Sequence, residues 1–204
     1  MEIEDNFSEN TANNLSAVFQ QTNVPVFQNK VYPSFAMAKE AEKGEVELVQ
    51  SSISGFVFNN SFQPHIMDYD VHYQNEQANS EVFQKHLTYV LQLLKGYGIK
   101  NKKVVEVGCG KAVFFDMMLS EGRDCWEFDP TYEDNNERIK KEYFDESQRG
   151  IAADVIIMRH TLEHITKPFT FLHTIARAND YKGFLFVEVP TFEWIVNKKA
   201  FCDI

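Results

Sequence analysis

Residues 103–130 read KVVEVGCGKAVFFDMMLSEGRDCWEFDP. The stretch begins with an apolar strand over 103–107 and passes through a glycine turn at 108–110 into a helix over 112–119. A second short apolar strand follows over 124–128. A strand, a tight turn, a helix and another strand predict a βαβ unit in a parallel sheet.

The alternation continues toward the C-terminus. A third strand is expected over 154–158 and a fourth over 183–189. The helix between them is expected over 168–178, with proline at the first-turn position that it favours. A charged helix is expected around 135–143. Short apolar strands separated by helices predict an α/β fold with a Rossmann-like, doubly wound parallel sheet.

The N-terminal half carries different signals. Residues 1–23 are polar and are expected to form a disordered tail. Residues 24–63 are expected to form a small β-rich module with two short strands. Residues 64–100 form a helical lead-in, in which Ser80 is the expected N-cap of a helix with apolar residues at helical spacing. The doubly wound domain then covers residues 101–204.

The composition limits the possible functions. The chain has 204 residues and a formal net charge of −10, which argues against binding nucleic acid through its phosphates. Its three cysteines are too few and too uneven in number for a disulfide framework. The N-terminus does not resemble a signal peptide, and no apolar run approaches the ~20 residues of a membrane span. We expect a cytoplasmic protein that binds neither nucleic acid nor membrane.

Polar residues gather at the ends of the first two predicted strands, where open α/β sheets bind ligands. Gly108 and Gly110 let the backbone turn sharply, and the free amides of the following helix can hold an anion. Asp129, nineteen residues after Gly110, can accept hydrogen bonds from ribose hydroxyls. Glu106, just before the turn, can contact a ligand ammonium. These residues are expected to hold opposite ends of one adenosyl ligand.

A nicotinamide-binding fold shares this topology but needs Gly-x-Gly-x-x-Gly before its helix. Here Lys111, Ala112 and Val113 follow Gly110, so the third glycine is missing. A pyrophosphate loses part of its cradle, whereas the sulfonium cofactor S-adenosyl-L-methionine (SAM) has no phosphate. SAM is therefore favoured, and a nicotinamide-dependent oxidoreductase is the weaker alternative.

Four motifs together resemble class I SAM-dependent methyltransferases of the sugar C-methyltransferase-like subgroup. They are Glu106-Val-Gly-Cys-Gly-Lys111, Glu127-Phe-Asp-Pro-Thr-Tyr132, Arg159-His-Thr-Leu-Glu-His164 and Glu188-Val-Pro190. The segment from Tyr69 to Ser80 resembles the subgroup's lead-in to the cofactor pocket. The combination covers roughly residues 46–204 and is more specific than any one motif.

The resemblance implies SAM as the cofactor and methyl transfer to a small molecule, such as a nucleotide-linked sugar or another cell-surface precursor. The implied cofactor-binding residues are Tyr69, Tyr73, Ser80, Glu106, Gly108, Cys109, Gly110, Asp129, Pro130, Arg159 and His160. The candidate catalytic residues are His160, His164 and Tyr73. Nothing in these residues selects carbon, oxygen or nitrogen as the acceptor atom.

The two histidines of the third motif also have a spacing that can suit zinc on a helix. Glu163 directly precedes His164, however, whereas the metalloprotease motif places Glu directly after its first His. No third ligand is apparent, so no metal site is predicted. Histidine titrates near neutral pH, which makes His160 or His164 a candidate general base.

The chain departs from the resembled family in three ways. The family's N-terminal module binds zinc through paired cysteines, but here the matching place reads Ser51-Ser-Ile-Ser54, so we expect the module without its metal. Ala112 replaces the third glycine of the first motif, and we expect weaker SAM binding. The chain ends at Ile204, before the family's Tyr-Glu-His segment and its later strands.

A chain truncated after its fourth predicted strand leaves that strand as an apolar edge. We expect a partner chain or a longer parent protein to cover it. The alternative function is therefore a truncated, catalytically inactive SAM-binding remnant or interaction module.

Overall fold

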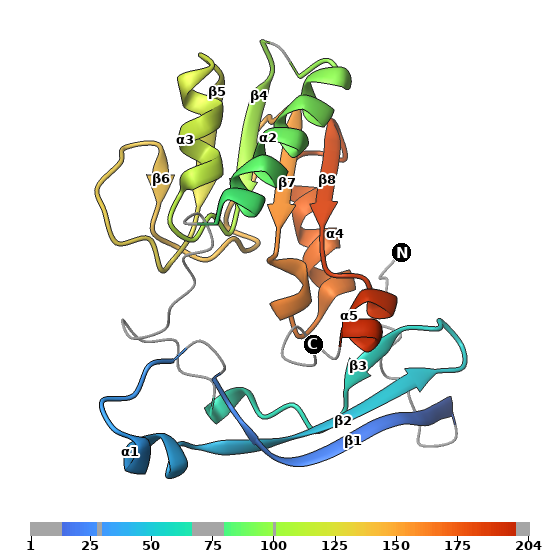
Figure 1. Ribbon diagram of the computed structural model, residues 1–204. Coiled ribbons are helices and arrows are strands. Elements are labelled where there is room, and N and C mark those ends of the chain that lie inside the picture. The colour runs from blue at the N-terminus through green and yellow to red at the C-terminus, as the bar shows by residue number, and fades with distance from the viewer. Residues whose placement is uncertain (1–13, 28–29, 67–79, 100, 199–204) are drawn as a thin grey trace. The chain divides into compact units, whose positions relative to one another are not determined.

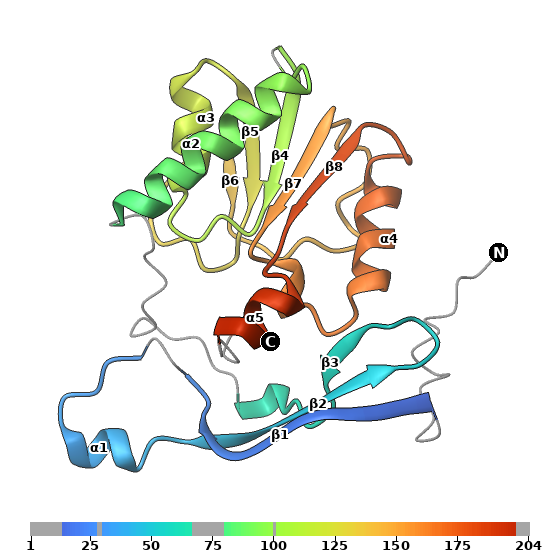
Figure 2. The same ribbon diagram turned by 45° about the vertical axis from the view of Figure 1, so that its right-hand side comes forward.

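The computed structural model describes residues 14–27, 30–66, 80–99 and 101–198 (Figures 1 and 2). The chain divides into two compact units, residues 1–75 with 191–204 and residues 76–190. The described elements of the first unit are β1 (Leu15–Pro25), α1 (Phe35–Lys39), β2 (Lys43–Ser51), β3 (Val57–Asn59), a 3-10 helix (Pro64–Ile66) and α5 (Phe192–Lys198). The elements of the second are α2 (Glu81–Gly96), β4 (Lys103–Val107), α3 (Val113–Ser120), β5 (Asp124–Phe128), β6 (Ile139–Lys140), β7 (Val155–Arg159), a 3-10 helix (Leu162–His164), α4 (Pro168–Ala178) and β8 (Phe184–Glu188).

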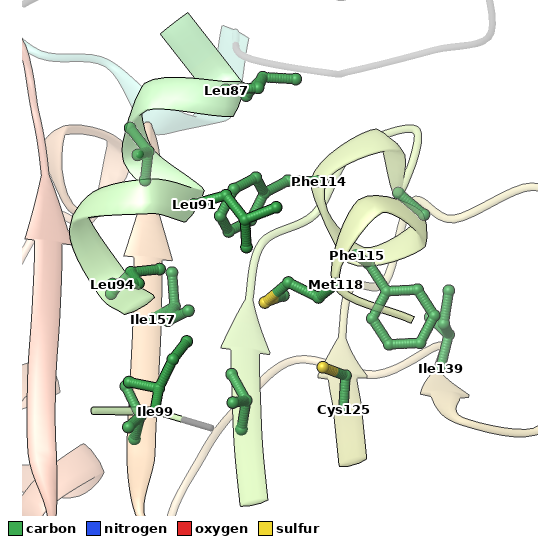
Figure 3. Packing of buried hydrophobic residues seen from close by; sticks show 14 residues of the cluster. Leu87, Leu91, Leu94, Ile99, Phe114, Phe115, Met118, Cys125, Ile139 and Ile157 are labelled. Carbon is green, nitrogen blue, oxygen red and sulfur yellow. The ribbon is translucent and has the colours of Figure 1, made fainter. Parts of the chain in front are cut away.

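The second unit is built on a five-stranded sheet in the order β6-β5-β4-β7-β8, in which every neighbouring pair is parallel. Helices α2 and α3 cover one face and pack on buried residues such as Val104 and Ile157 (Figure 3). Helix α4 covers the opposite face, where Ile175 packs with Val105 and Ile156. The predicted Rossmann-like, doubly wound sheet is confirmed, because the strands alternate with helices and the central ones are buried on both faces.

Helix α2 forms where the apolar spacing predicted it. The Ser80 side chain accepts a hydrogen bond from the Phe83 amide at 3.5 Å and so caps the first turn. Four residues at helical spacing are between 1% and 4% exposed, namely Leu87, Val90, Leu91 and Leu94. Full burial of such a side chain contributes about 1.5–3 kcal/mol, so this face, rather than the cap, holds the helix on the sheet.

The charged helix expected around 135–143 is wrong. Asn136 Oδ1 accepts the Arg138 amide at 3.0 Å, a local turn that competes with helix formation. The chain then forms the short strand β6, which pairs with β5 and buries Ile139 to 6% exposure. The need to bury this residue at the sheet edge outweighs the helix propensity of its charged neighbours.

The disordered tail expected over 1–23 is wrong for residues 15–23, which belong to β1. This strand pairs antiparallel with β2, from Leu15 opposite Ser51 to Pro25 opposite Lys43. Most of its side chains are exposed, so the residues look polar and unstructured although the backbone ladder orders them. Residues 1–13 lie outside the described residues.

Strands β2 and β3 confirm the two short strands expected in the β-rich module. In the turn after β2, Ser51 Oγ accepts the amides of Ile53 at 3.3 Å and Ser54 at 3.4 Å. The hydroxyl therefore stabilises the turn at the place where the resembled family has zinc ligands. Across the described ranges, no group of three or more His, Cys, Asp or Glu side chains is arranged to hold a metal ion. The predicted domain boundaries stay predictions.

Strand β8 lies at one edge of the parallel sheet. Phe184 is 72% exposed and Leu185 is 43% exposed, although β7 beside them is fully buried. The partner chain or longer parent expected to cover this strand stays a prediction. Among the helices of the described ranges, none combines the length and apolar character that a membrane span needs.

Candidate functional site

The glycine loop between β4 and α3 adopts the conformation that its sequence requires. Gly108 has φ 84° and Gly110 has φ 58°, both in the left-handed region that glycine enters without strain. Ala112, where the resembled motif has a third glycine, has φ 60° and ψ 18°. A left-handed backbone destabilises an alanine by about 1 kcal/mol. Ala112 therefore adopts the conformation that glycine favours, at a cost that glycine does not have.

Gly108 also lies against the loop that follows β7. A side-chain Cβ at this position would fall 2.2 Å from Thr161 Oγ1, which is far inside van der Waals contact. Thr161 in turn donates its hydroxyl to the Val107 carbonyl at 3.1 Å. The glycine is therefore required by both its φ angle and the close approach of Thr161.

Asp129, at the end of β5, faces the glycine loop directly. Its Oδ2 accepts the Gly110 amide at 2.7 Å, and its Oδ1 accepts the amide and the hydroxyl of Thr131, each at 2.7 Å. The carboxylate is only 5% exposed. The structure thus brings together the loop and the acid that the sequence paired, and it gives this carboxylate three protein donors. Pro130, the next residue, is exposed.

Two buried glutamates lie side by side beneath this loop. Glu106 in β4 and Glu127 in β5 are direct partners in the parallel register, and they are 2% and 0% exposed. Burial raises the pKa of both carboxyl groups above the ordinary value of 4.5, and their mutual proximity raises that of Glu127 further. Two adjacent buried carboxylates cannot both ionise, so Glu127 holds a proton at neutral pH.

A second polar cluster lies at the ends of β7 and β8. Glu188 Oε2 accepts Arg159 Nε at 2.7 Å, and Glu188 Oε1 contacts Nε2 of His86 from α2. The Arg159 guanidinium lies 4.5 Å from the centre of the Phe114 ring and is 6% exposed. Burial would raise the Glu188 pKa, but His160, Arg159 and His86 lower it to about 2.

His160, in its protonated form, lies in the same cluster. Its Nδ1 is 3.4 Å from Glu163 Oε1 and its Nε2 is 3.7 Å from Glu188 Oε1. These two carboxylates raise the His160 pKa to about 9, so the ring is protonated at neutral pH. A protonated ring has no lone pair to accept a proton, which favours an electrostatic role over that of a base. Its predicted catalytic role stays a prediction.

The other predicted site residues lie in varied surroundings. His164 is exposed in the 3-10 helix after β7, and Ser80 is exposed and caps α2. Cys109 is half-buried, with Sγ 3.7 Å from the Gly110 carbonyl oxygen. Tyr69 and Tyr73 lie outside the described residues. The roles predicted for these residues stay predictions.

Two members of the second cluster, His86 and Glu188, are missing from the predicted site. His86 lies among apolar residues at helical spacing, which indicate a packing face. Glu188 belongs to a motif of the predicted family, without a predicted role in the site. The signal that could have found them is a polar residue on an otherwise apolar face of a helix or strand, which is costly unless it meets a partner.

A parallel sheet of this order, with its glycine loop and the acid on the neighbouring strand, is the arrangement of class I methyltransferase domains and also of nicotinamide-binding domains. In agreement with this fold, the chain matches the model of a methyltransferase domain family over residues 74–201. The match covers more than half of the chain, so the protein belongs to this family. The comparison with curated proteins gives no match.

Proposed function

We propose that the protein is a SAM-dependent methyltransferase that binds its cofactor at the ends of β4 and β5. The observation that carries the proposal is the hydrogen bond from the Gly110 amide to Asp129 Oδ2 at 2.7 Å. It brings the left-handed glycine loop and the acid of the neighbouring strand to one place at the sheet edge. Ligands bind at this edge in open α/β sheets.

The residues present fit such a cofactor. Glu106 Oε2 is buried and has no hydrogen-bond partner among the described residues, so it is an acceptor available to the ammonium group of SAM. The amides in the first turn of α3 are suited to a carboxylate. Asp129 is suited to ribose hydroxyls once these replace the Gly110 amide or the Thr131 hydroxyl as donors.

When bound, SAM supplies an electrophilic methyl group. The chain's own residues then bind and orient the two reactants, and correct positioning alone can contribute several orders of magnitude in rate. Resemblance to the sugar C-methyltransferase-like subgroup supports a nucleotide-linked sugar or another small cell-surface precursor as the acceptor. A cytoplasmic location and the absence of nucleic-acid or membrane partners remain predictions.

Calorimetry with SAM and, separately, with NAD tests the proposal. We expect SAM to bind in the micromolar range and NAD not to bind. Asp129→Ala should weaken SAM binding at least tenfold, because it removes the ribose acceptor, worth about 1.5–3 kcal/mol for a charged hydrogen bond. Asp124→Ala, which alters an exposed carboxylate at the start of the same strand, is the matched control. Unchanged affinity in Asp129→Ala would remove this residue from the site.

A SAM-binding module without methyl-transfer activity is the second candidate function. The three donors already held by Asp129 and the left-handed Ala112 favour it, because both make the loop less ready to receive a ligand. Methyl transfer to a pool of nucleotide sugars separates the two candidates. Turnover identifies an enzyme, whereas SAM binding without turnover supports the module.

A further inference from the structure

His86 reaches the carboxyl-end edge of the sheet from α2. Figure 3 shows Leu87, Leu91 and Leu94 in order from the arrowhead end of the strands toward their starts, so the first turns of α2 lie at the site edge. His86, beside Leu87, contacts Glu188, the last residue of β8. The two residues are 102 positions apart in the chain, and only the packing of α2 on the sheet joins them.

The ionisation state of Glu188 decides which ring nitrogen of His86 carries the proton. Arg159 Nε at 2.7 Å and the protonated His160 ring at 3.7 Å keep the carboxylate ionised. An ionised carboxylate can only accept hydrogen bonds, so Nε2 of His86 must donate. In the neutral ring this leaves the lone pair on Nδ1.

The His86 side chain is also accessible, with 41% of its surface exposed. Within the described residues, the polar contact of this ring is made through Nε2 alone. Phe83 holds the ring in place, with ring centroids 6.1 Å apart, and also contacts His160 at 6.4 Å. Among the residues that the structure describes, His86 therefore has an oriented ring and an acceptor nitrogen without a polar partner. His160, whose two nitrogens both face carboxylates, has no such nitrogen.

We propose that His86, oriented by Glu188, is the general base that takes the acceptor's proton during methyl transfer. The inference rests on the proposed function. The acceptor's nucleophilic atom forms a bond to the methyl carbon, and the carbon–sulfur bond breaks with its electron pair left on sulfur. The acceptor's proton passes to Nδ1, and the imidazolium so formed is stabilised by the Glu188 carboxylate. Charged groups facing the ring are Glu188 from β8 and, beyond it, Arg159 and His160 from the end of β7, with Glu163 behind His160.

Histidine-resolved ¹⁵N NMR of the whole chain tests the orientation without any ligand. We expect the neutral His86 ring to carry its proton on Nε2 and to be unprotonated at Nδ1. Glu188→Gln should mix the two tautomers, because a neutral amide can also donate. A neutral His86 ring protonated at Nδ1 would overturn the inference.

Kinetics test the role itself. His86→Asn should lower kcat about 100-fold or more, the usual contribution of a general base, and should remove from the pH profile of kcat the limb that depends on the base. SAM affinity should stay within twofold, since His86 acts on the acceptor. His173→Asn, the same change in α4, is the matched control, and thermal unfolding checks that each variant is folded. A His86→Asn variant with wild-type kcat overturns the inference.

The two proposals fail in different ways. A wild-type chain that does not bind SAM overturns the proposed function. A wild-type chain that binds SAM while His86 has the wrong tautomer overturns only the inference about the base.

Discussion

Glu127 and Glu188 lie on the same face of one parallel sheet, yet their ionisation is opposite. Glu127 is fully buried beside Glu106 and Asp129, and burial together with these acids raises its pKa far above the ordinary 4.5. Glu188 has two histidines and an arginine around it, and they lower its pKa to about 2 despite its burial. The residue type is the same, so the neighbouring side chains from other parts of the fold decide which glutamate is neutral and which is an anion.

The largest expected effect comes from removing the Glu188 carboxylate. Glu188→Ala should lower the free energy of unfolding at pH 7 by about 3–5 kcal/mol, because it leaves the buried Arg159 guanidinium without its carboxylate. Glu188→Gln, which keeps an acceptor oxygen, should cost about 1–2 kcal/mol. Urea denaturation measures both. A loss below about 1 kcal/mol in Glu188→Ala would show that the ion pair between Glu188 and Arg159 does not stabilise the fold.

A somewhat smaller effect is expected at Gly108, where the glycine loop contacts the loop that follows β7. Gly108→Ala places a methyl group against Thr161 and imposes φ 84° on an alanine, so it should destabilise the chain by about 2–4 kcal/mol. The control is Gly122→Ala, where φ is 73° but no atom lies within 4 Å of the added Cβ. This variant should lose only about 1 kcal/mol. Equal losses in thermal unfolding would argue against the close contact.

The last effect is a slope with pH, at most about 1.4 kcal/mol per pH unit, and it separates the two glutamates directly. Glu127 keeps a proton in the folded chain that the unfolded chain releases above pH 4.5, so stability should fall as pH rises beyond that value. His160 adds to the fall as pH rises from 6.5 to about 9, where its folded-state proton is lost. Glu127→Gln should flatten the fall between pH 7 and 9 by up to about 1.4 kcal/mol per pH unit.

In contrast, Glu188 contributes stability that is present above pH 4.5 and is lost as pH falls toward about 2. Glu188→Gln should therefore flatten the acidic limb. It should also reduce the His160 part of the alkaline fall, because Glu188 is one of the two carboxylates that raise the His160 pKa. Urea denaturation across pH 3–9 checks both variants. A Glu127→Gln variant that follows the wild-type alkaline limb would mean that Glu127 is ionised in the folded state.

Local patterns in the sequence were enough for much of the fold and for half of the candidate site. Helix α2, the turn at Gly108 and the strands β4, β5, β7 and β8 each depend on signals within about twenty residues. Asp129 could be paired with Gly110 because consecutive strands of a βαβ unit end at the same edge. Strand β1 could not be predicted from local patterns, because the hydrogen bonds to its partner strand β2 order its polar residues.

The amino-acid sequence by itself thus determined the alternation of strands and helices, the left-handed loop and the acid that faces it. Tertiary structure alone decided that Ile139 forms a strand, that His86 meets Glu188 and that Glu127 is neutral. The reason is physical, because periodicity and backbone preference act along the chain. Burial and charge, by contrast, act between residues that only folding brings together.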